Sequence, residues 1–238
     1  MNPSGSTQLR HRWGKARWKL LLIPLLVVVA IATVLLVRHT LVDTPGAAPS
    51  GEASPGHRPV VVVIGDSFTS GSDMNAGPTW AERLGAKQHW NLHRDGESGT
   101  GFLNDGPTRS FQKRLPDLIK KYASPDMVIV AGGHNDIARF PPAQIDRAAG
   151  EVLDQLHDAW PDAKIELLSP VVSGTPTEPS LAQTARFREV ATRHHADFID
   201  VSRFLDGVPG GIGSDGIHPT DKGHAILARK VAASLPAP

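Results

Sequence analysis

Two short apolar runs constrain the fold of this chain more than any other feature. Residues 60–64 (VVVVI) and 127–131 (MVIVA) contain no polar residue, and a glycine follows each of them directly. Runs of this kind are typical of strands buried on both faces of a parallel sheet, and parallel strands need a long crossover between them. Because helix-like and further strand-like patterns alternate along residues 59–238, the sequence predicts an α/β fold with a parallel sheet covered by helices.

Amphipathic spacing predicts the remaining elements. The longest helical pattern places Ile145, Ala149 and Val152 on one face and stops before Pro161. Thr220 is a candidate amino-terminal cap for the last helix. The expected helices are 80–88, 111–122, 141–160, 181–194 and 221–233, and the expected further strands are 90–94, 165–168 and 198–201.

The amino-terminal part has the pattern of a membrane segment followed by a tether. Residues 20–37 carry no charge and are mostly apolar. As a helix they would be about 27 Å long, close to the roughly 30 Å hydrocarbon core of a bilayer. Five basic and no acidic residues lie within 1–19, which predicts a cytoplasmic amino terminus and an extracytoplasmic body. Residues 38–58 are rich in Pro, Gly, Ala and Ser and indicate a flexible linker.

The predicted organisation is therefore a basic cytoplasmic segment (1–19), a transmembrane helix or signal anchor (20–37), a flexible linker (38–58) and one globular domain (59–238). A signal peptide cleaved near residue 48 is the alternative, and it would make the protein secreted. The anchor is favoured because the apolar run is longer than the 7–15 residues of a typical signal-peptide core.

Charge and cysteine content exclude several classes of function. Beyond residue 37 the chain carries 20 basic and 24 acidic residues, which gives no electrostatic basis for binding nucleic acid. The absence of cysteine excludes disulfides, thiolate metal sites and a cysteine nucleophile. The histidines show no convincing metal-ligand spacing, so we expect no metal and no cofactor.

Polar chemistry is concentrated in four segments that lie at strand ends or turns. They are residues 65–68 (GDSF), 96–101 (GESGTG), 132–136 (GGHND) and 215–220 (DGIHPT). Ligands of open α/β sheets bind at the carboxyl ends of the strands, where Ser67 is expected. A serine hydroxyl needs a base to become a nucleophile, and His218 with Asp215 three residues earlier supplies a base and its partner. Each segment alone is a common turn, but together they indicate a serine hydrolase.

In this order the four segments resemble the SGNH (GDSL-type) hydrolase superfamily, whose blocks are marked by Ser, Gly, Asn and His. The matching residues are Ser67, Gly99, Asn135 and His218, and the resemblance spans about residues 60–235. Phe68 stands where leucine is commoner. The resemblance implies a flavodoxin-like three-layer α/β/α sandwich with a mostly parallel five-stranded sheet in strand order 2-1-3-4-5.

The resemblance also implies a role for each of these residues. Ser67 would attack an acyl carbonyl, His218 would act as general base and then general acid, and Asp215 would orient the imidazole. The oxyanion hole would consist of the backbone N–H groups of Ser67 and Gly99 and the side-chain amide of Asn135. The expected activity is that of an extracytoplasmic ester hydrolase, a carboxylesterase or deacetylase that favours short acyl chains on a small-molecule, glycan or lipid ester.

Three further residues of these segments are expected to support the site. Asp66 and Asp136 would fix loops through hydrogen bonds, and Asp136 is also a candidate helix-start residue. His134 stands at the variable position of the third block, where it would line the substrate pocket or act as a spacer.

Three alternatives stay open from the sequence. A cell-envelope O-acyltransferase would use the same triad with a sugar hydroxyl as acceptor. A tethered binding module would keep the fold without catalysis, although all five key positions are intact. A metal-dependent phosphoesterase would use Asp66, His134, Asn135, Asp215 and His218 as ligands and would leave Ser67 without a role.

Overall fold

The computed structural model describes residues 57–173 and 175–236. The predicted segments 1–19 and 20–37, and the predicted linker up to residue 56, lie outside the described residues. Within residues 57–173 and 175–236, no helix combines the length and the apolar character that a membrane span requires.

A five-stranded parallel sheet forms the centre of the described part. Its strands are β1 (Val60–Gly65), β2 (Asn91–Gly96), β3 (Met127–Ala131), β4 (Lys164–Leu168) and β5 (Asp197–Ile199). Every neighbouring pair is parallel, as the sequence predicts, and the strand order β2-β1-β3-β4-β5 is the one that the resemblance implies. In the register Gly65 pairs with both Gly96 and Ala131, so the carboxyl ends of the three strands are level. The segments that follow these strands therefore start at one edge of the sheet.

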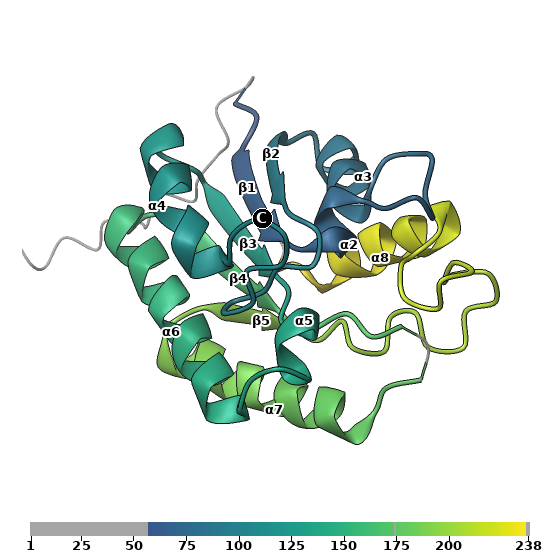
Figure 1. The fold of residues 1–238 in the computed structure, drawn as a ribbon. Helices are drawn as coiled ribbons and strands as arrows, with labels where there is room; N and C mark the ends of the chain where they lie inside the picture. Colours follow the sequence, from purple (N-terminus) through teal and green to yellow (C-terminus); the bar gives the residue numbers. More distant parts are fainter. Residues whose placement is uncertain (1–56, 174, 237–238) are drawn as a thin grey trace, which may run out of the picture. The chain divides into compact units, whose positions relative to one another are not determined.

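Helices cover both faces of the sheet (Figure 1). α3 and α8 pack on one face, and α4, α6 and α7 pack on the other. Two four-residue helices, α2 and α5, follow β1 and β3 at the carboxyl edge and were not expected from the sequence. The helices are α2 (Ser67–Ser70), α3 (Trp80–Lys87), α4 (Phe111–Lys121), α5 (His134–Ile137), α6 (Pro142–Ala159), α7 (Glu178–Arg193) and α8 (Asp221–Ser234).

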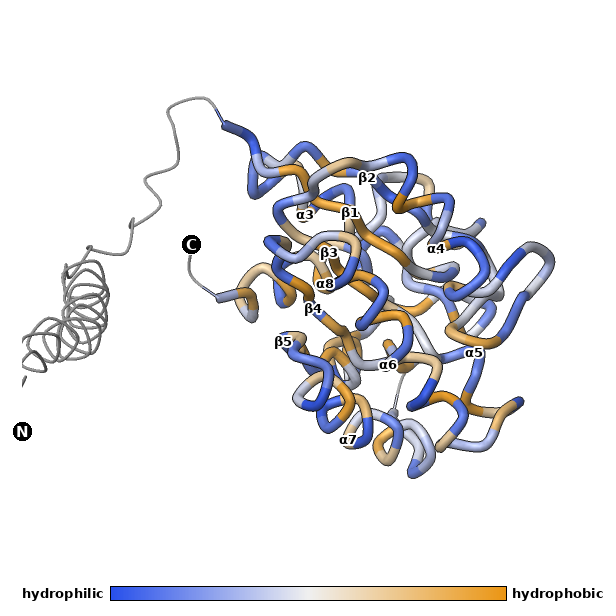
Figure 2. Tube along the Cα trace, turned by 90° about the vertical axis from the view of Figure 1, so that its left-hand side faces the viewer, coloured by the Kyte–Doolittle hydropathy of each residue, from blue (hydrophilic) through white to orange (hydrophobic). Residues whose placement is uncertain are grey.

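Alternate side chains of the central strands enter two separate hydrophobic cores. In β1, Val62 and Ile64 pack with the α4, α6 and α7 side, whereas Val61 and Val63 pack with α3 and α8. All four side chains are at most 1% exposed, which explains why the run contains no polar residue. Figure 2 shows hydrophobic residues concentrated along β1, β3 and β4.

Observed boundaries differ from the predicted ones by a few residues. The largest difference is at α7, which begins at Glu178 rather than near residue 181. Thr177 is its cap residue and Pro179 lies in its first turn, where the missing N–H of proline has no cost. The helical pattern of apolar residues starts later than the helix because the first turn is partly exposed.

Candidate active site

Ser67 lies at the junction between β1 and α2. It is the first residue of α2 and is 7% exposed. Asp66 precedes it as the cap residue of this short helix, and its carboxylate accepts a hydrogen bond from the Phe68 N–H at 3.0 Å. This hydrogen bond spans Ser67 and restrains the backbone on both sides of it. Ser67 is therefore held in a fixed backbone conformation at the carboxyl edge of the sheet.

The carboxyl group of Asp66 is buried beside the serine. Burial raises the pKa of Asp66 to about 7, and the nearby carboxyl of Asp136 acts in the same direction. The hydrogen bond from Phe68 and the positive charge of Arg114 oppose this rise. Asp66 therefore changes charge near neutral pH, at the cap position directly before Ser67.

The loop after β2 brings Gly99 to the same edge of the sheet. Gly99 has φ +75°, a left-handed conformation that disfavours residues with a side chain. Its carbonyl accepts a hydrogen bond from Asn104 Nδ2 at 2.9 Å. Within the described residues the Gly99 N–H donates no hydrogen bond, so it is available to a ligand.

Asn135 lies in α5, directly after β3. Its side-chain Nδ2 donates to the carbonyl of Thr100 at 2.9 Å, which uses one of its two N–H groups. The second N–H of the amide stays available. Asn135 is thus oriented by the carbonyl of Thr100, the residue after Gly99, and the second and third sequence blocks are in direct contact.

Asp136 fixes a loop through hydrogen bonds, as expected from the sequence. Its carboxylate accepts three backbone N–H groups, from Phe102 (2.8 Å), Leu103 (3.1 Å) and Asn104 (2.9 Å). It lies in the first turn of α5 but does not begin the helix, which starts at His134 with Gly133 as its cap residue. Burial raises the pKa of Asp136, and these three hydrogen bonds oppose the rise.

The fourth block forms a turn that holds an aspartate–histidine pair. Asp215 Oδ2 lies 2.6 Å from His218 Nδ1, and Asp215 Oδ1 accepts the N–H groups of Ile217 and His218 at 2.9 and 3.0 Å. These hydrogen bonds lower the pKa of Asp215 to about 2. The carboxylate is therefore charged at neutral pH and favours the tautomer with the proton on Nδ1.

Phe68 connects this turn to the serine segment. Its ring centroid lies 5.8 Å from that of His218 and 6.0 Å from that of His134. The aromatic ring next to the nucleophile candidate thus packs against the base candidate, which is distant in sequence. The structure contains no hydrogen bond from Ser67 Oγ to His218; in hydrolases without substrate such contacts are commonly long and tighten on binding.

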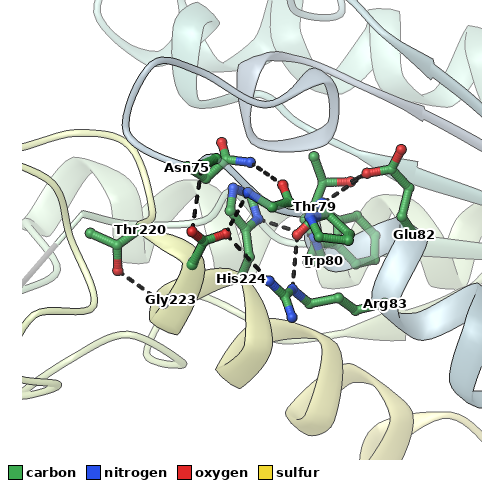
Figure 3. Close-up of polar contacts among 12 residues, drawn as sticks. Asn75, Thr79, Trp80, Glu82, Arg83, Thr220, Gly223 and His224 are labelled. Carbon is green, nitrogen blue, oxygen red and sulfur yellow. Dashed lines mark hydrogen bonds and ion pairs between the residues drawn. The ribbon is translucent and has the colours of Figure 1, made fainter.

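Hydrogen bonds tie the start of α8 to the loop before α3 (Figure 3). Asp221 accepts the Gly77 N–H at 2.9 Å and lies 3.3 Å from the Arg83 guanidinium. His224 Nδ1 accepts the Trp80 N–H at 3.1 Å. Because α8 begins three residues after His218, this network supports the turn that carries the histidine.

Two residues of the site region were not predicted from the sequence. Asn104 lies in the loop after β2, and Arg114 lies in α4 with its side chain 2% exposed. Arg114 contacts Asp95 at 2.8 Å and donates to Gly65 O and to Thr100 Oγ1. Arg114 stands on the apolar face of α4, three residues after Phe111, and this position could have indicated a buried charge.

No metal centre is formed by the described residues. Among residues 57–173 and 175–236, no group of three or more His, Asp or Glu side chains is placed to hold a metal ion. The polar groups at the carboxyl edge instead combine a serine, an aspartate–histidine pair and free amide donors.

The fold is that of an α/β protein with candidate catalytic groups at the carboxyl edge of a parallel sheet, and the family match identifies an ester-hydrolysing enzyme. Residues 63–226 match the GDSL-like Lipase/Acylhydrolase family. This chain belongs to that family, and thereby to the SGNH (GDSL-type) hydrolase superfamily.

One curated protein is similar to this chain in sequence, and several solved structures have a similar fold. The chain is 28% identical over 191 residues to the GDSL lipase Rv0518 of Mycobacterium tuberculosis, covering 72% of this chain and 79% of the relative. The esterase EstA of Pseudoalteromonas has a similar fold, with TM-score 0.60, 17% identity, and 74% of this chain and 96% of that chain covered. A family two carbohydrate esterase from Clostridium thermocellum gives TM-score 0.61, 19% identity, and 74% and 63% coverage.

Proposed function

We propose that this protein is an extracytoplasmic serine ester hydrolase that forms an acyl-enzyme on Ser67. The observation that carries the proposal is the position of His218. Asp215 binds Nδ1 of its ring, and the ring packs against Phe68, the residue directly after the serine. A base with an ionised partner, packed on the residue that follows a buried serine, is suited to activating the serine hydroxyl when a substrate binds.

The reaction follows from these positions. Ser67 Oγ attacks the carbonyl carbon of the ester while His218 Nε2 takes its proton, and Asp215 balances the charge on the imidazolium. The negative oxygen of the tetrahedral intermediate is bound by the N–H groups of Ser67 and Gly99 and by the free N–H of Asn135. When the carbon–oxygen bond to the alcohol breaks, His218 returns the proton to the alcohol. A water molecule, activated by His218 in the same way, then releases the acid and restores Ser67.

We favour short acyl chains and a polar alcohol part. The segments that follow β1, β2 and β3 carry the hydroxyl groups of Ser70 and Ser98, whose Oγ atoms lie 3.1 Å apart, and the imidazole of His134, which lies beside Phe68. These groups suit hydrogen bonds to a hydroxylated alcohol better than contact with a long alkyl chain. The fold is shared with a carbohydrate esterase from Clostridium thermocellum, which agrees with a glycan ester as substrate.

The place of action follows from residues 1–37. An apolar run preceded by five basic residues favours an anchored protein with residues 59–238 outside the cytoplasm. In intact cells, protease added from outside should digest the body of the full-length protein, and fractionation should recover the intact protein with membranes. Recovery in the cytosol would contradict this location.

A single substitution tests the catalytic proposal. Ser67→Ala in the full-length protein should abolish hydrolysis of p-nitrophenyl acetate and labelling by a fluorophosphonate probe, without changing the melting temperature greatly. Ser234→Ala, at the exposed end of α8, is the matched control and should keep both signals. Near wild-type activity of the Ser67 variant would refute the proposal. Product analysis with an acetylated polysaccharide and a free sugar acceptor separates hydrolysis from acyl transfer.

A further inference from the structure

Asn104 contacts two of the segments that supply oxyanion donors. Its side-chain Nδ2 donates to the carbonyl of Gly99 at 2.9 Å and to the carbonyl of Asn135 at 3.3 Å. Its Oδ1 accepts the N–H of Gly106 at 3.3 Å, so the three bonds engage both N–H groups and the oxygen of the amide. The residue is 8% exposed, and solvent therefore offers little replacement for these bonds.

The backbone of Asn104 is held independently of its side chain. Its N–H donates to Asp136 Oδ1 at 2.9 Å, and its carbonyl accepts the Gly101 N–H at 2.9 Å. A change of the side chain leaves both backbone bonds possible. The loop can therefore keep its path when the amide is removed, and the effect of the amide can be measured separately.

We propose that Asn104 is a positioning residue that holds Gly99 and Asn135 at the separation the oxyanion hole requires. This inference rests on the proposed function, because it assigns a task within that site. Gly99 lies in the loop after β2 and Asn135 in α5, so their relative position depends on contacts between these two segments. The Asn104 amide bonds to the backbone of both residues at once.

The expected effect follows from the geometry of transition-state stabilisation. Donors have to lie about 2.7–3.1 Å from the developing oxyanion, and loss of one donor typically costs about 10²–10³ in kcat. If a donor is misplaced rather than removed, kcat should fall by a smaller factor than this. Binding of the uncharged ground-state ester depends less on these donors, so KM should change little.

The test compares two variants of the full-length protein. Asn104→Asp keeps the shape of the side chain but places a carboxylate against two carbonyl oxygens, whereas Asn104→Ala removes the amide without adding charge. In both, kcat for p-nitrophenyl acetate should fall about 10–100-fold with KM within about threefold. The affinity for an alkyl boronic acid, which forms a tetrahedral adduct with a serine nucleophile, should fall by a similar factor. Rates are normalised to the protein that reacts with a fluorophosphonate probe at completion, so misfolded protein does not enter the comparison.

Gln155→Glu is the matched control. Gln155 Nε2 also donates to a backbone carbonyl, that of Glu151 at 3.1 Å, on α6. This substitution should leave kcat and boronic acid affinity within about twofold of wild type.

Two outcomes separate this inference from the proposed function. Wild-type kcat in both Asn104 variants, or a rise in KM alone, would overturn the positioning role while Ser67→Ala remains inactive and the proposed function stands. Absence of any Ser67-dependent hydrolysis in the wild-type protein would overturn both.

Discussion

The carboxylate of Asp215 lies 2.6 Å from the imidazole of His218, and both residues belong to one turn. Their relative position therefore depends on a local backbone conformation, which the N–H groups of Ile217 and His218 stabilise by donating to the same carboxylate. The turn is closed by the Gly213 N–H, which donates to the His218 carbonyl at 2.8 Å. Asp215 and His218 are thus held together by this turn and lie beside Phe68, the residue that follows Ser67.

Asp215→Asn should lower kcat by about 10²–10⁴-fold while leaving the turn largely intact. An asparagine keeps the shape, but a neutral amide neither favours the proton on His218 Nδ1 nor balances the imidazolium charge. The pKa of Asp215 is lowered to about 2, so in the wild type the carboxylate stays ionised from pH 4 upward and its own titration does not limit activity. Steady-state kinetics between pH 5 and 9 check this, and an Asn variant with wild-type kcat would contradict the orienting role.

Gly101→Ala should reduce both stability and activity. A Cβ at this position would lie 2.1 Å from Asp136 Oδ2, so the carboxylate and the loop that it holds would have to move. We expect a loss of about 1–3 kcal/mol in the free energy of unfolding, typical of overpacking. Urea denaturation measures the loss.

A double-mutant cycle of Gly101→Ala with Asp136→Ala is the control for this mechanism. Asp136→Ala alone leaves three buried N–H groups without their acceptor and should itself destabilise the protein. Since it also removes the atom with which the new Cβ collides, the two effects should be less than additive by at least about 0.5 kcal/mol. Simple additivity would show that the collision does not occur.

Glu166 should make the protein less stable as pH rises. It lies in β4, is 0% exposed, and neither carboxylate oxygen has a hydrogen-bond partner among the described residues. Burial raises its pKa from 4.5 to about 7, and the nearby Asp197 adds to the rise. The folded state therefore binds the proton more tightly than the unfolded state, and the resulting stability is complete below pH 4.5 and lost between about pH 4.5 and 7.

Glu166→Leu removes this titration. At pH 8 the variant should exceed wild type in unfolding free energy by about 1–3 kcal/mol, and the difference should shrink at pH 4.5, where the wild-type carboxyl is protonated. Asp158→Asn, on the exposed side of α6, serves as control and should show no such dependence. A difference that is the same at both pH values would exclude the buried charge as its cause.

His224 should make the protein less stable in acid. Its Nδ1 accepts the Trp80 N–H, and burial lowers its pKa from 6.5 to about 4, with the charge of Arg83 acting in the same direction. The unfolded state therefore binds the proton more readily, and the stability contributed by neutral His224 is complete above pH 6.5 and lost between about pH 6.5 and 4.

His224→Asn tests this contribution, because an amide oxygen can accept the Trp80 N–H without titrating. Thermal unfolding should show wild type losing stability relative to the variant as pH falls from 6.5 to 4, by up to about 3 kcal/mol. Parallel pH profiles of the two proteins would show that His224 does not titrate in this range.

Much of the architecture follows from local pattern. Side chains of β1, β3 and α6 face a hydrophobic core, and burial requires them to be apolar. The requirement produces the apolar runs of the two strands and the 3–4 spacing of the helix, and these patterns can be recognised in the sequence. The strand order came from the resemblance, and the structure has the same order. The short helices α2 and α5 produce no recognisable pattern, because four residues are too few to show a helical period.

The sequence by itself determined which residues are candidates for the chemistry: Ser67, Gly99, Asn135 and the Asp215–His218 pair each stand in a recognisable local motif. Only the tertiary structure decided how they are held. Asp136 binds the loop at Phe102–Asn104 instead of capping its own helix, Asn104 bonds to the backbones of Gly99 and Asn135, and Phe68 packs against His218. These contacts join segments that are far apart in the chain, and they depend on strand register and loop path, which residue spacing does not encode.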